Sequence, residues 1–191
     1  MDQFVSIYIL CILILISYIY YDSYYSELVS VESSIDGRIY LVRNLKDKIE
    51  AANLLATIRK NLIQLVNHLE IKYPNDERVA RLLLRYKPDN LIESTPSNKY
   101  TSYSINKGEK VVLCLRSRNS KNILVKKNLL MFVALHEVAH IMTKSVGHTK
   151  EFWDNFRFLL KESIKTKLYI KQNFRKYPKE YCGTQITDSP L

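Results

Sequence analysis

Two histidines four residues apart, with a glutamate directly after the first, stand in the sequence His136-Glu137-Val138-Ala139-His140. Four residues along an α-helix turn through about 400°, so both imidazoles leave the same face of the helix. This spacing allows both rings to bind one zinc ion at about 2.0–2.1 Å, and it brings the carboxylate near enough to take a proton from water. The motif therefore predicts a hydrolytic zinc site with Glu137 as general base.

An ordinary amphipathic helix that carries histidines by chance is the alternative. The seven residues before the motif's first histidine are all apolar (LLMFVAL, residues 129–135), which favours a buried helix. A glutamate and two histidines are costly in such a helix unless something pairs with them. A divalent cation would remove this cost, so we prefer the metal site.

A third ligand is expected because catalytic zinc sites commonly have three protein ligands and one open position. His148 lies eight residues beyond His140 and directly after Gly147, a residue that permits a reversal of the backbone. Glu151 is the alternative ligand, since sites with two histidines and a glutamate also exist. Its position better suits the first turn of the next helix, where negative charge is favourable. We predict His136, His140 and His148 as zinc ligands.

The segment ALHEVAHIMTKSVGHTKEFW, residues 134–153, resembles the metal-site signature of zincin-like metallopeptidases of the SprT and WLM type. In these families the HExxH helix is followed by a short loop and a GH…F segment, matched here by Gly147-His148 and Phe152. A looser resemblance covers residues 100–165. The general likeness is to small WLM-like metallopeptidases predicted in large DNA viruses of eukaryotes.

The resemblance implies roles for individual residues. His136, His140 and His148 would hold zinc, and Glu137 would be the general base. It also implies that the strand before the motif helix, here Val111–Arg116, lines the cleft. An edge strand offers unpaired N–H and C=O groups to an extended peptide, so this strand would bind the substrate.

The elements that must position the motif are mainly helical. Two segments with β-branched and aromatic residues, on either side of Gly108, predict an antiparallel hairpin. The last residues, 173–191, are expected to be irregular. The fold class that we expect is α+β: a mainly helical zincin-like domain with a small antiparallel hairpin or sheet beside the HExxH helix. Apolar periodicity and capping residues predict helices over residues 41–71, 76–86, 125–143 and 149–170, and the hairpin strands over 100–105 and 110–116.

The N-terminal segment, residues 4–21, has no charged residue and ends in tyrosines that suit a membrane–water boundary. Eighteen residues are at the short end of what spans a bilayer. A cleaved signal peptide is the alternative, but the chain begins Met-Asp-Gln and lacks a basic start. We therefore expect one transmembrane helix. The expected organisation is an anchor at 1–25, a juxtamembrane spacer at 26–40 and the metallopeptidase domain at 41–191.

Composition limits the class and the surroundings of the protein. Hydrophobic residues make up 47% of the 191 residues and charged residues 25%, which excludes wholesale disorder. The net charge of +10 favours a polyanion, either nucleic acid or anionic lipid, as a partner; solubility alone is the alternative. No CxxC or close Cys–His spacing is present, which argues against a structural zinc finger.

The side of the membrane follows from charge and cysteine. Every Lys and Arg lies after the apolar segment, which favours a cytoplasmic domain. Cys11 lies in that segment, so Cys114 and Cys182 leave at most one pair, and a reducing compartment is the simpler interpretation. Cys182 is expected to be a buried thiol.

The expected function is a membrane-anchored zinc metallopeptidase that acts on protein or peptide substrates. One alternative is a non-catalytic, membrane-anchored zinc-binding protein with a structural or interaction role and a basic surface. A basic nucleic-acid-binding module is another, although no recognisable motif supports it. Tyr181 and Tyr103 are candidates to stabilise the oxyanion. His68 is expected to be structural, because no partner accompanies it at ligand spacing.

Overall fold

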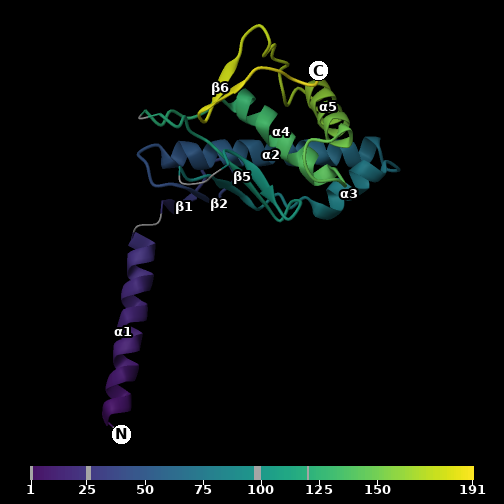
Figure 1. Ribbon diagram of the computed structural model, residues 1–191. Helices are drawn as coiled ribbons and strands as arrows, with labels where there is room; N and C mark the ends of the chain where they lie inside the picture. Colours follow the sequence, from purple (N-terminus) through teal and green to yellow (C-terminus); the bar gives the residue numbers. More distant parts are fainter. Residues whose placement is uncertain (1, 25–26, 97–99, 120) are drawn as a thin grey trace.

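The computed structural model describes residues 2–24, 27–96, 100–119 and 121–191. Figure 1 shows a long N-terminal helix followed by a folded domain of helices and small sheets. The helices are α1 (Asp2–Tyr24), α2 (Lys48–Lys72), α3 (Glu77–Arg85), α4 (Lys127–Met142) and α5 (Lys150–Lys165). The predicted α+β class with mainly helical content is confirmed.

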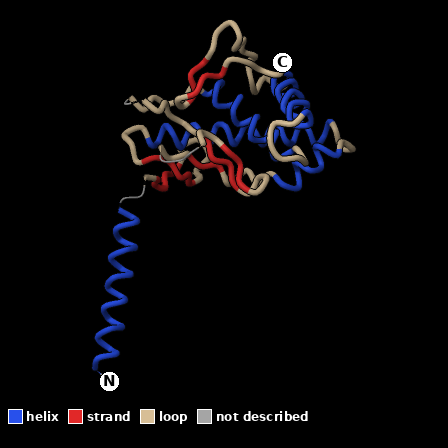
Figure 2. The backbone as a smooth tube through the Cα atoms, viewed as in Figure 1, coloured by secondary structure: helices blue, strands red, loops and turns tan. Residues whose placement is uncertain are grey.

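In the described part of the chain, three small sheets accompany these helices (Figure 2). One is the hairpin β1–β2, one is three-stranded in the order β3-β5-β4, and one is the hairpin β6–β7 near the end of the chain. The strands are β1 (Leu28–Glu32), β2 (Ile39–Arg43), β3 (Leu91–Glu93), β4 (Tyr103–Ile105), β5 (Lys110–Leu113), β6 (Lys179–Tyr181) and β7 (Thr184–Ile186).

Helix α4, which carries the HExxH motif, runs through the centre of the core. It contacts α2, α3 and α5 as well as strands β4 and β5. Twelve of its 16 residues are buried, which agrees with its mainly apolar composition. The motif is therefore held on a helix that is packed from several sides.

Side-chain caps set the starts of two helices where the sequence predicted them. The Asp76 carboxylate accepts a hydrogen bond from the backbone N–H of Arg78 at the start of α3. The Thr149 hydroxyl accepts one from the backbone N–H of Phe152 at the start of α5. Each cap satisfies a backbone donor that the helix itself leaves unpaired.

Regular structure is present within the segment expected as a spacer, residues 26–40, at residues 28–32 and 39–40. They belong to the antiparallel hairpin β1–β2, whose Val31, Tyr40 and Val42 are buried. This hairpin packs against α2. The predicted start of the long helix at residue 41 is wrong, because α2 begins at Lys48. Burial on alternate residues of β2 is the period-two pattern of a strand, and two five-residue strands are too short for it to stand out.

The three-stranded sheet corrects the predicted role of the strand before the motif helix. The hairpin of β4 and β5 is confirmed, with Ile105 opposite Lys110. However, β5 is the central strand, because β3 pairs with it in parallel on the other side. Its backbone groups are therefore already paired, and the edge of this sheet beside α4 is β4.

The tail expected to be irregular contains the hairpin β6–β7. Its turn is Cys182-Gly183, and both residues have positive φ, at 51° and 85°. Two-residue hairpin turns of this kind favour Asn-Gly or Asp-Gly, so a cysteine in the first position hid the signal. The turn follows Tyr181, which is buried.

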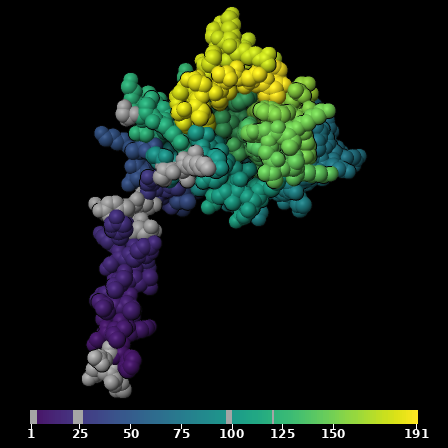
Figure 3. All heavy atoms as spheres, in the orientation of Figure 1, coloured from purple at the N-terminus to yellow at the C-terminus, as the bar shows by residue number. Residues whose placement is uncertain are grey.

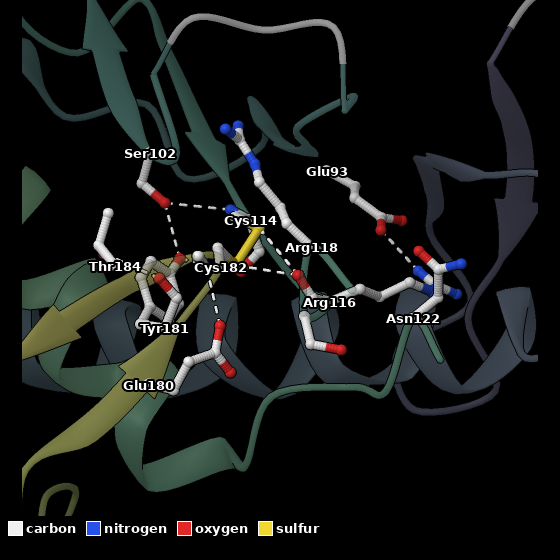
Figure 4. Close-up of a disulfide and its surroundings, with 12 residues drawn as sticks. Glu93, Ser102, Cys114, Arg116, Arg118, Asn122, Glu180, Tyr181, Cys182 and Thr184 are labelled. Carbon is white, nitrogen blue, oxygen red and sulfur yellow. Dashed lines mark hydrogen bonds and ion pairs between the residues drawn. A yellow bond between two sulfur atoms is a disulfide. The ribbon is translucent and has the colours of Figure 1, made fainter. Parts of the chain in front are cut away.

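Cys182 is bonded to Cys114 in a disulfide, so the expectation of a free buried thiol is wrong. Figure 4 shows the bond between the end of β5 and the C-terminal hairpin, with the Tyr181 hydroxyl between Ser102 and the Cys114 carbonyl. Disulfides form and persist in oxidising surroundings. The bond is therefore an observation against the reducing compartment that the sequence favoured.

Helix α1 stands apart from the core. Its side chains from Phe4 to Tyr21 are exposed, and this 18-residue stretch has a mean hydropathy of 2.3. By length and composition it could cross a membrane, as either an anchor or a signal segment.

Candidate metal centre

The three predicted histidines come together in the structure. His136 and His140 project from α4, and His148 returns from the loop after it, where Gly147 has a φ of 84°. One ring nitrogen from each lies within 4.8 Å of the other two, and the Nε2 atoms of His136 and His148 are 3.1 Å apart. Nitrogens that share a tetrahedral zinc ion at 2.0–2.1 Å lie about 3.3 Å apart. The residues therefore fit a zinc ion with three imidazole ligands.

The environment keeps two of these rings neutral, which is the form that binds metal. Burial, with a smaller contribution from neighbouring histidines, lowers the pKa of His136 to about 3. Burial likewise lowers the pKa of His140 to about 4, with His148 and Lys107 adding to the effect. Each of these rings is therefore neutral at neutral pH, with one ring nitrogen that carries no proton.

Aromatic side chains from α5 fix the orientation of the rings. Phe152 stacks on His140 with ring centroids 4.3 Å apart and meets His136 edge-on at 4.8 Å. Trp153 lies beside His148, with centroids 5.5 Å apart. The phenylalanine of the GH…F segment thus acts as a packing partner of the ligands.

The loop that carries His148 is held by charged side chains. The Lys107 ammonium donates to the backbone carbonyls of residues 143, 144 and 145, at 2.6–3.0 Å. The Glu151 carboxylate accepts from the backbone N–H groups of Lys144 and Ser145. These contacts lower the pKa of Glu151 and use its oxygens in the loop. Glu151, the alternative third ligand, is therefore a loop-holding residue, and it lies outside the histidine group.

Glu137 lies one residue beyond His136 and is only 4% exposed. Burial raises the pKa of its carboxyl group to about 8. A carboxyl group with a pKa near neutral is suited to both take up and release a proton. A cation beside it would favour the ionised form.

A hollow of about 460 Å³ lies over the three histidines and Glu137, and strand β4 forms another part of its wall. Tyr103 of β4 lines this hollow, so it shares a cavity with the histidines. The Tyr181 hydroxyl instead donates to the Cys114 carbonyl at 2.9 Å, and burial raises its pKa. Of the two predicted candidates, Tyr103 shares a hollow with all three histidines, whereas Tyr181 lines a neighbouring hollow that reaches His136 and Glu137.

The fourth histidine is structural, as expected. The His68 Nε2 lies 3.1 Å from the Glu162 carboxylate, to which Lys72 and Tyr73 also donate. Burial of Glu162 acts to raise its pKa, but hydrogen bonds from Lys165, His68 and their neighbours together lower it to about 2. This cluster joins α2 to α5, away from the metal centre.

Sequence comparison places the motif in a known group of domains. The profile described as the WLM domain matches residues 78–190. Uncharacterized protein R325 of Acanthamoeba polyphaga mimivirus is 37% identical over 170 residues, covering 87% of this chain and 86% of that protein. Uncharacterized protein 042R of Invertebrate iridescent virus 3 is 39% identical over 83 residues, covering 43% and 49% respectively.

Solved structures were compared as well. The crystal structure of Wss1 from Saccharomyces cerevisiae is similar with a TM-score of 0.47 and 20% sequence identity, over 64% of this chain and 84% of that chain.

Proposed function

The chain belongs to the WLM family, and on this premise we propose that it is a zinc-dependent metallopeptidase that hydrolyses peptide bonds. One observation carries the proposal: three histidine nitrogens converge within 4.8 Å beside a buried glutamate. A site that only stored metal would have no use for that carboxylate. The non-catalytic zinc-binding alternative therefore leaves Glu137 unexplained.

The division of work among the residues follows from their positions. His136, His140 and His148 would hold the ion and leave one coordination position open. Zinc, when bound, supplies a Lewis acid that polarises a carbonyl and lowers the pKa of water. Glu137 takes the proton of the attacking water and then delivers it to the leaving amine.

Strand β4 is the proposed binding strand for an extended substrate. It is an edge strand, and its residues Tyr103 and Ser104 line the hollow over the histidines. An extended peptide could add to this edge through backbone hydrogen bonds, without a required sequence. The resemblance implied that the strand before the motif helix binds the substrate; we propose β4 for this role instead.

We also propose that α1 anchors the domain to a membrane. Its exposed apolar side chains support this. If the proposal is right, the uncleaved full chain should stay in the membrane fraction after washing with high salt and carbonate. The cytoplasmic placement stays a prediction, and the Cys114–Cys182 bond counts against it. A polyanion partner for the basic surface also stays a prediction.

Removal of metal tests the proposed activity. We expect the purified full chain in detergent to cleave an unfolded, dye-labelled protein, and a zinc chelator to abolish cleavage because the histidines lose their ion. Stoichiometric zinc should restore the rate, as followed by fluorescence release. Cleavage that continues in excess chelator would contradict the proposal. Bound zinc without turnover on any peptide would support the non-catalytic alternative.

A further inference from the structure

A second hollow adjoins the candidate metal centre, between α4 and the C-terminal segment of the chain. Its volume is about 610 Å³, and His136 and Glu137 form part of its wall. Most of the remaining wall is apolar and includes Phe132, Val133, Trp153, Phe156, Ile186 and Leu191. A group held at the histidines therefore has an apolar space directly beside it.

The outer wall of this hollow is the C-terminal segment, residues 181–191, which we call the C-terminal wall. Figure 3 shows the end of the chain, in yellow, as a ridge next to the green residues of the domain. Cys182 is bonded to Cys114, and the Arg157 Nε donates to the Pro190 carbonyl oxygen at 2.7 Å. The wall is therefore fixed to the domain at both of its ends.

Two arginines that line the hollow each form an ion pair. Arg175 forms an ion pair with Asp188 at 2.8 Å, and Arg157 forms one with Asp154 at 3.1 Å. A charged substrate side chain entering the hollow would lose water and would have to compete with these ion pairs for a partner, which is unfavourable. An apolar side chain meets no such penalty.

We propose that this hollow binds a large apolar side chain of the substrate next to the bond that is cut. The inference rests on the proposed function and adds a substrate class to it: peptides with an aromatic or long aliphatic residue at that position. Neighbouring residues would bind only through their backbone along β4. Full burial of such a side chain corresponds to roughly 10- to 100-fold tighter binding than alanine.

The test uses the full chain carrying Glu137→Gln, which keeps the hollow but removes the base. Trp153 lines the hollow and is the chain's single tryptophan, so its fluorescence reports binding without any turnover. Two peptides are titrated, identical in their Gly, Ser and Ala residues except for one central Phe or Ala. We expect the Phe peptide to bind roughly 10- to 100-fold more tightly and to change the Trp153 emission. Equal affinity for the two peptides would overturn the proposal.

A matched pair of variants locates the effect. Ile186→Asp places a carboxylate in the hollow and should remove the preference for Phe. Ile71→Asp makes the same change at the end of α2, where the side chain is 83% exposed, and should leave the preference intact. Loss of preference in both variants would contradict the assignment, and the two-peptide comparison needs neither variant.

The outcome also separates this inference from the function on which it rests. If the Phe peptide is preferred but the parent chain hydrolyses neither peptide, the apolar site stands and the peptidase proposal fails. If the parent hydrolyses both with the same kcat/KM, the peptidase stands and the selective site is wrong.

Discussion

Replacement of Glu137 by glutamine is expected to lower kcat for peptide hydrolysis by roughly 10²- to 10⁴-fold, the range that general acid–base catalysis contributes. Glutamine has nearly the shape of glutamate, so the packing of α4 is kept, but it cannot take a proton from water. Three histidines, and not Glu137, would hold the ion, so the zinc content of the variant should remain at the parent level. Rates on a labelled unfolded protein and zinc content per chain provide the measurement.

Glu70→Gln is the matched control, because Glu70 is exposed on α2, outside the metal centre. It should cleave at the parent rate. A Glu137→Gln chain that cleaves as fast as the parent would show that another group is the base. A variant that loses both zinc and activity would instead place Glu137 in the metal-holding set.

Loss of the disulfide is expected to have the largest effect on stability. The bond closes a loop between residues 68 apart, and the chain-entropy relation gives about 4 kcal/mol for a loop of that length. Replacing Cys114 and Cys182 together by alanine should lower the free energy of unfolding by about this amount. Chemical denaturation of the full chain in detergent, with and without reductant, measures it.

Cys11→Ala is the control for this prediction, because Cys11 lies exposed in α1. It should leave the free energy of unfolding of the domain unchanged. The chain has three cysteines, so thiol titration of the unfolded, unreduced protein should find one. Three reactive thiols would show that the bond does not form in the protein as isolated, and would restore the reducing compartment as the better interpretation.

The histidine cluster was predictable because its position depends on short spacings in the sequence. His136 and His140 must share a helix face, and Gly147 marks the reversal that returns His148 to them. The same holds for Asp76 and Thr149, whose capping bonds reach only two or three residues along the chain. The family resemblance also depends on the local spacing of residues, those of the segment 134–153.

Features that depend on contacts between distant parts of the chain could not be predicted from local spacing. The parallel pairing of β3 with β5 made β5 a central strand and moved the proposed substrate edge to β4. Lys107 reaches the carbonyls of the loop before His148, about 36 residues away, and no periodicity marks such a contact. The same is true of the bond between Cys114 and Cys182, which positions the wall of the apolar hollow.

Zinc content and coordination of the full chain test the central claim most directly. X-ray absorption of the parent should show one zinc ion per chain with three imidazole nitrogens at about 2.0–2.1 Å. His148→Ala should weaken zinc binding by more than the roughly 10- to 100-fold that follows loss of a residue supporting a ligand. A parent chain that binds no zinc, or a His148→Ala chain with unchanged zinc affinity, would contradict the three-histidine centre.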